Sequence, residues 1–206
     1  MQTPGRKGPA VTDRASHLRL WLTVALGVAL DVASKYAAWD RLGGPVEDGG
    51  REVTLLPGWI HLVARRNPGI VFGINFSDSL GLGPDASRAL TILLTLATAA
   101  LIFYVFAVSR HSQRWLHASC GLILAGAIGN LFDRVAFGYV RDLIQITAHA
   151  TIGGLKIDWP YVFNLADVYL VVGVAAIALV FLFSPAPPRT DGAGAKTGGN
   201  PKRERS

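Results

Sequence analysis

The sequence of 206 residues contains one cysteine and few charged side chains. The single Cys120 excludes a disulfide within the chain and any metal site built from several cysteines, and a small buried residue in a membrane helix is its favoured role. Only 17% of the residues are charged, against about a quarter in soluble proteins, while half are hydrophobic. This composition favours a membrane protein of one domain.

The sequence also lacks the common patterns of other enzyme classes. It has no Gly-x-Ser-x-Gly elbow, no His-Glu-x-x-His helix and no P-loop. His111 and His117 are predicted to be interfacial or solvated, because no ligand pattern accompanies them. We therefore predict no metal and no cofactor. The formal net charge is +6, but the basic residues form no stripe, which argues against nucleic acid as a partner.

Four apolar runs approach the length of about 20 residues that a helix needs to cross a membrane. The predicted spans are 18–39, 89–108, 115–133 and 162–183. The first run is long and carries Asp31 and Lys35, so it does not resemble a cleavable signal peptide. Spacings of three and four between small residues in the third run predict close helix packing: Gly121, Ala125, Gly126 and Gly129.

The segments between the spans differ in charge. Residues 1–16 and 184–206 are polar and basic and are predicted to be disordered tails. The tails and the loop 110–114 have excess Lys and Arg, which places them in the cytoplasm. Residues 40–88 and 134–160 then form outer segments. Partial alternation over 52–64 and 140–147 predicts strands there, and Gly138 allows the third helix to end.

Polar side chains gather at the outer ends of the spans, where burial makes them costly and a function is expected. Two Asn-x-x-Asp patterns, Asn130 with Asp133 and Asn164 with Asp167, place each Asn on the helical face of its Asp. Asp31 and Lys35 also share a helical face. They can form an internal ion pair, lock the first helix to its neighbours, or do both. Three further polar residues lie at the same depth: Asn67, Arg134 and Asp142.

A pair of close carboxylates in a site of low dielectric shares one proton. Such a pair can activate water and protonate a carbonyl oxygen, which indicates an intramembrane aspartic hydrolase. A carrier or proton relay uses similar residues, and an assembly factor without catalysis is a third possibility. From the residues alone, Asp133 is as good a dyad candidate as Asp142, and Asp31 is a weaker one. Asn67 serves either a turn or a substrate backbone.

The motifs occur in an order that resembles the bacterial lipoprotein signal peptidases (signal peptidase II). The resemblance covers about residues 20–183. It rests on Asp31-Val-Ala-Ser-Lys35, Arg66-Asn67-Pro-Gly69 with Phe72-Gly73, Gly129-Asn130-Leu-Phe-Asp133-Arg134, Val140-Arg-Asp142 and Phe163-Asn164-Leu-Ala166-Asp167.

This resemblance implies an all-α membrane protein of four transmembrane helices, in which the outer segment 40–88 supplies a small extracytoplasmic β cradle and a short helix. It implies an endopeptidase of the bacterial inner membrane that is a monomer and contacts membrane lipids. It also implies inhibition by globomycin. The substrates would be prolipoproteins, cut just before a diacylglyceryl-modified cysteine by the catalytic pair Asp142 and Asp167. The implied supporting or substrate-binding residues are Asn67, Gly69, Asn130, Asp133, Arg134, Asn164, Ala166, Asp31 and Lys35.

The sequence departs from the family pattern in three places. Pro68, Ile70 and Val71 replace smaller residues, Arg141 and Leu143 flank Asp142, and the loop 147–158 is longer than usual. None of these departures removes a predicted catalytic group. We expect them to alter the local shape of the substrate groove and the sensitivity to inhibitors.

Overall fold

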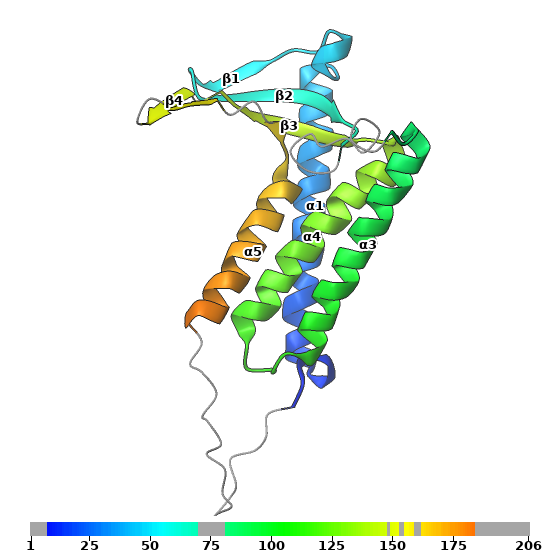
Figure 1. Cartoon of the computed structure of the whole chain (residues 1–206), viewed down its shortest axis with the longest axis vertical. Helices are drawn as coiled ribbons and strands as arrows, with labels where there is room; N and C mark the ends of the chain where they lie inside the picture. Colours follow the sequence, from blue (N-terminus) through cyan, green and yellow to red (C-terminus); the bar gives the residue numbers. More distant parts are fainter. Residues whose placement is uncertain (1–7, 70–80, 148, 153–154, 159–161, 184–206) are drawn as a thin grey trace, which may run out of the picture.

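Four long helices run alongside one another in the computed structural model of the chain (Figure 1). The structure describes residues 8–69, 81–147, 149–152, 155–158 and 162–183. Within these ranges, four helices are long and apolar enough to cross a membrane, which agrees with the predicted number of four helices. They are α1 (Arg14–Leu42), α3 (Pro84–Val108), α4 (Arg114–Phe137) and α5 (Leu165–Phe183).

The helix boundaries differ from the predicted ones. Helices α1 and α3 begin earlier than residues 18 and 89, because polar and proline residues are accepted in a first helical turn. The fourth span begins later than predicted, since residues 162–163 form a strand and Asn164 precedes α5. Helix α4 ends where Gly138 adopts a left-handed φ of 83°. That glycine was predicted to let the helix end there.

The predicted disordered tail is wrong for residues 8–16. A short 3₁₀ helix, η1 (Ala10–Thr12), packs beside the loop between α3 and α4, and the Ala10 N–H donates to the Ser109 carbonyl at 2.8 Å. Asp13 then caps α1 by accepting the Ser16 N–H at 2.7 Å. The remaining tail residues, 1–7 and 184–206, lie outside the described residues.

A small antiparallel sheet lies across one end of the helices (Figure 1). Its strand order is β1 (Val53–Leu56), β2 (Ile60–Asn67), β3 (Val140–Ile146) and β6 (Val162–Phe163). Strands β4 (His149–Ile152) and β5 (Leu155–Asp158) form a separate hairpin in the long loop. The predicted strands over 52–64 and 140–147 are confirmed.

The structure describes only part of the first outer segment, 40–88, for which a short helix was predicted. The described part of 40–88 contains one 3₁₀ turn between α1 and β1, η2 (Val46–Asp48). Residues 70–80 lie outside the described residues. The sheet, by contrast, is anchored directly on the helices, because Leu143 of β3 packs with Ala38 and Leu42 of α1 and with Ala64 of β2.

Helix α4 is the central helix of the bundle. It is buried at many positions from Leu116 to Arg134, whereas α3 buries only Ser87, Thr91 and Phe106. Its small residues allow this, as predicted. A Cβ on Gly126 would lie 2.5 Å from the Ala166 carbonyl oxygen of α5. The missing side chains therefore let α1 and α5 approach α4 closely.

We expect Gly126→Ala to destabilise the protein by about 1–3 kcal/mol, the usual cost of overpacking, because backbone of α5 blocks the new methyl group. The measurement is unfolding in detergent, followed by circular dichroism. Gly83→Ala is the matched control, since nothing lies within 4 Å of a Cβ at that position. Equal stability of the two variants would contradict the close packing of α4 and α5.

Candidate active site

The polar residues predicted to act together meet where α4, α5 and the sheet join. Helix α5 begins with a reciprocal capping box. The Asn164 side-chain oxygen accepts the Asp167 N–H at 3.1 Å, and the Asp167 carboxylate accepts the Asn164 N–H at 3.1 Å. The second Asn-x-x-Asp pattern is thus a helix N-terminus, which fixes the Asp167 side chain at the start of α5.

Asp142 lies in the middle of β3 and is 2% exposed. Its carboxylate accepts two amide hydrogen bonds, from Asn67 Nδ2 at 2.8 Å and from Asn164 Nδ2 at 2.8 Å. Asn67 ends β2 and pairs with Val140 of β3. The register of β2 and β3 therefore brings Asn67 beside Asp142, although 75 residues separate them in the chain.

Asn164 joins the two predicted catalytic carboxylates. Its side chain donates to Asp142 and its backbone N–H donates to Asp167. Asn130 of α4 also holds the Asp167 carboxylate, because its Nδ2 donates to Asp167 Oδ1 at 2.8 Å. Asp142 is buried and Asp167 is half-buried. The structure thus places the two carboxylates together, with the Asp167 side chain the more accessible one.

The surroundings of Asp142 favour its protonated form. Burial, followed by the charge of Asp167, raises the pKa of Asp142 to about 7. The amides of Asn67 and Asn164 oppose this shift, because they donate to the ionised carboxylate. A carboxyl group with this pKa can give or take a proton near neutral pH.

The Lys35 ammonium group lies at the centre of a second cluster of polar side chains, next to the one around Asp142 and Asp167. Its ammonium group lies 2.8 Å from Asp31, 3.2 Å from Asp133 and 3.1 Å from the Asn130 side-chain oxygen. The other oxygen of Asp31 accepts the Ala166 N–H at 2.9 Å, in the first turn of α5. Asp31 and Lys35 therefore form an internal ion pair and also lock α1 to its neighbours, so both predicted roles hold.

Asp133 is fully buried and is occupied by two cations. Besides Lys35, it accepts two side-chain hydrogen bonds from Arg141, at 2.8 and 3.1 Å, and the Arg141 N–H at 2.9 Å. The Arg141 guanidinium also lies 4.3 Å from the Tyr36 ring centre and 4.4 Å from that of Phe137. Asp133 thus ties β3 to α4 and has no side-chain oxygen left for a reaction.

Arg134 and Asn67 shape the segment before residue 70. Arg134 donates to the Gly69 carbonyl at 3.1 Å and to the Asn130 carbonyl at 3.3 Å. The Asn67 side-chain oxygen accepts the Gly69 N–H at 2.9 Å, as in an Asx turn. Asn67 therefore makes the predicted turn with one end of its amide and holds Asp142 with the other.

The structural role of Arg141 and of the two rings that enclose it was not predicted from the sequence. The available signal was an arginine within a largely apolar strand, since a buried arginine requires an acidic partner. Among the described residues, no group of three His, Cys, Asp or Glu side chains could hold a metal ion. The absence of a cofactor stays a prediction.

Arg141→Met should lower the free energy of unfolding by about 3 kcal/mol, because it leaves the buried Asp133 with one cation fewer. Combining it with Asp133→Asn should cost less than the sum of the single changes, since the two residues share one interaction. Denaturant unfolding in detergent measures both effects. Arg65→Gln, at an exposed position of β2, is the control. Additive losses, or an equal loss in the control, would contradict the pairing.

Known proteins share both the sequence and the fold. The family model described as signal peptidase (SPase) II matches residues 23–183. The lipoprotein signal peptidase of Chlorobaculum tepidum is 35% identical over 166 residues, which cover 79% of this chain and 93% of the relative. That of Methylocella silvestris is 34% identical over 183 residues, covering 89% of this chain and 92% of the relative.

A structure described as a bacterial membrane enzyme, solved at 2.3 Å resolution, is also similar. It has a TM-score of 0.61 and 26% sequence identity, and the match covers 78% of this chain and 85% of that one. The family model and the relatives both match nearly the whole described helical region of the chain. This chain therefore belongs to the signal peptidase II family, and it is a multi-pass membrane protein and a protease.

Proposed function

We propose that the protein removes the signal peptide from diacylglyceryl-modified prolipoproteins, cutting before the modified cysteine with Asp142 and Asp167 as the catalytic pair. Membership of the signal peptidase II family supports this substrate class. The observation that carries the catalytic assignment is the hydrogen bonding of both carboxylates to Asn164. Asp133 is a poor alternative, because cations and a backbone N–H occupy it.

The charges around the site support a pair that shares one proton. Three cations, Lys35, Arg134 and Arg141, face four carboxylates: Asp31, Asp133, Asp142 and Asp167. Lys35 and Arg141 balance Asp31 and Asp133. Arg134, which interacts electrostatically with both Asp142 and Asp167, balances one of that pair. One proton on the pair makes this largely buried group neutral, as the low dielectric requires.

The geometry suits a division of labour between the two carboxylates. Asp167 is the more accessible and acts as the base that takes a proton from the attacking water. Asp142 holds the shared proton and gives it to the oxygen of the scissile carbonyl. The water oxygen bonds to the carbonyl carbon and forms a tetrahedral intermediate. Transfer of the Asp167 proton to the departing amide nitrogen then breaks the C–N bond, and the second hydroxyl returns its proton to Asp142.

The distribution of basic residues orients the protein in the bacterial inner membrane. Four arginines lie at the helix ends opposite the sheet: Arg14, Arg19, Arg110 and Arg114. The positive-inside rule places this end in the cytoplasm, with both chain termini. The sheet and the catalytic pair then lie at the outer face, where a lipid-anchored substrate is available. We also propose that the protein is a monomer and that globomycin inhibits it.

We expect Asp142→Asn and Asp167→Asn to abolish cleavage of a diacylglyceryl-modified prolipoprotein, at least a thousandfold, because each removes one partner of the proton transfer. The assay uses purified protein in lipid with a chelator, and unfolding measurements confirm that each variant folds. Asp133→Asn is the discriminating variant. Full activity of Asp142→Asn together with a folded but inactive Asp133→Asn would overturn the assignment.

Cleavage should decrease as the pH rises through about 7, because Asp142 must hold its proton in the active form. The Asn67 amide stabilises the ionised carboxylate. Asn67→Ala therefore raises the pKa of Asp142 and should move the alkaline limb of the pH profile to higher pH, besides lowering activity. Thr54→Ala, on the exposed strand β1, should leave the limb unchanged. A limb that moves to lower pH in Asn67→Ala would contradict the assignment.

A further inference from the structure

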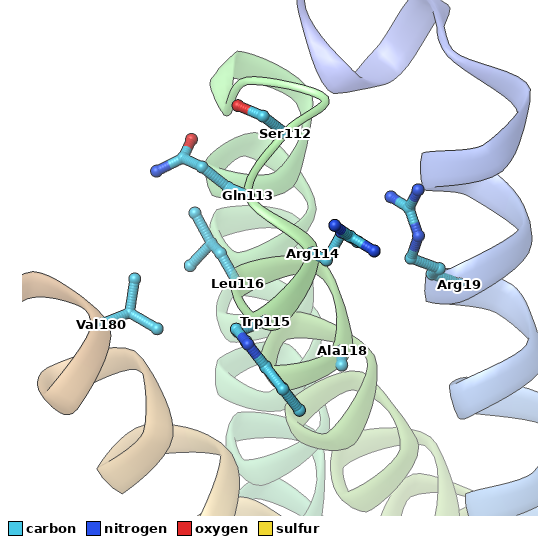
Figure 2. A pocket seen from close by; sticks show the side chains of 8 residues that line it. All are labelled: Arg19, Ser112, Gln113, Arg114, Trp115, Leu116, Ala118 and Val180. Carbon is cyan, nitrogen blue, oxygen red and sulfur yellow. The ribbon is translucent and has the colours of Figure 1, made fainter.

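A pocket lies at the end of the helix bundle opposite the sheet, far from the catalytic pair (Figures 1 and 2). Its volume is about 630 Å³, within the range of small-molecule sites. Figure 2 shows its walls. Arg19 projects from α1, Arg114 and Trp115 begin α4, and Val180 faces them from α5. Residues of three long apolar helices thus contribute to one hollow near the helix ends.

A partly buried chain of hydrogen bonds holds Arg19 in this pocket. Its guanidinium donates to His117 Nδ1 at 3.4 Å. A guanidinium carries no acceptor, so His117 accepts at Nδ1 and carries its proton on Nε2. That nitrogen lies 3.1 Å from Ser109 Oγ, which donates to the Phe106 carbonyl at 2.6 Å. Of the two predicted alternatives for His117, the solvated one is wrong, because its side chain is fully buried and positions a cation. The interfacial one stays a prediction.

Among the described residues, Asp13 interacts electrostatically with Arg19 but forms no ion pair with it. Within the described part of the chain, neither Arg19 nor Arg114 forms an ion pair with a carboxylate. The described acidic residue at this end, Asp13, accepts the Ser16 N–H and the Ser16 hydroxyl, both at 2.7 Å. Two guanidinium groups in one hollow therefore offer their donors to an anion from outside the chain.

Besides the two arginines, Ser112 and Gln113 are the polar residues of the pocket wall, and the remaining wall is apolar and continues onto the lipid-facing surface. Leu116 and Val180 line it, and Trp115 is 79% exposed at its edge. A tryptophan at the end of a span is typical of the membrane interface, where its ring meets both headgroups and chains. A small hydrophilic anion would leave this wall uncovered. The ligand that matches both parts is anionic at one end and apolar at the other.

We propose that this pocket binds an anionic glycerophospholipid, with the headgroup phosphate between Arg19 and Arg114 and an acyl chain along Trp115 and Val180. The arrangement needs only that the four helices span the membrane, so it is independent of the proposed catalytic pair. A lipid bound here contacts α1, α4 and α5 together. It would therefore link three spans at the end where no sheet connects them.

Native mass spectrometry of the full-length protein tests the site. The purified protein is titrated with phosphatidylglycerol and, separately, with phosphatidylcholine of the same acyl chains. The pocket variant is Arg19→Gln/Arg114→Gln. The matched control is Arg14→Gln/Arg110→Gln, which removes the same charge from exposed positions at the same end. A third titration adds inorganic phosphate to the complex with phosphatidylglycerol.

We expect the unmodified protein and the control to prefer phosphatidylglycerol. The pocket variant should bind it about 30-fold more weakly, since each basic group near an anionic lipid contributes about fivefold. Its cleavage activity in a zwitterionic bilayer should remain, which separates this result from any failure of the catalytic assignment. Equal weakening in both double variants, no preference between the lipids, or release of the lipid by millimolar phosphate would overturn the proposal.

Discussion

The buried ammonium group of Lys35 is the interaction on which the site depends. It binds two carboxylates and one amide oxygen, so each of its three N–H groups has a partner. Through Asp31 it reaches the first turn of α5, and through Asp133 it reaches β3. One cation from α1 thus connects α4, α5 and β3, and the proposed catalytic pair lies on α5 and β3. Removing either carboxylate would leave a charge buried without full compensation, which is expensive in an apolar interior.

The polar residues divide into two layers with different roles. One layer consists of carboxylates neutralised by cations: Asp31 by Lys35, and Asp133 by Lys35 and Arg141. The other layer consists of carboxylates held mainly by amides, which position a charge without neutralising it. This difference explains why only the layer held by amides is suited to proton transfer. A carboxylate between two cations is a weak base, whereas a pair that shares one proton changes its charge near neutral pH.

The two ends of the bundle have opposite character. At one end the sheet and the capping box gather four carboxylates and several amides, and the chain supplies three cations. At the other end neither Arg19 nor Arg114 forms an ion pair with a described carboxylate. Between them α4 presents glycines to α1 and α5, so the spans approach closely enough for short polar side chains to bridge them. The candidate active site and the pocket at the opposite end are thus both built on α4.

The sequence by itself determined the four long apolar helices, the basic end and the strands, because hydrophobic period and charge are local properties. It did not predict the cap that Asn164 and Asp167 form at the start of α5, since both residues were expected inside a helix. It did not distinguish Asp133 from Asp142, although the family resemblance favoured Asp142. Only the tertiary structure decided which carboxylate meets Arg141 and which meets Asn164, since this depends on the register of β2 and β3 and on the packing of α4 against α5. The burial of His117 was equally hidden, because spacing along one helix does not reveal which neighbours cover it.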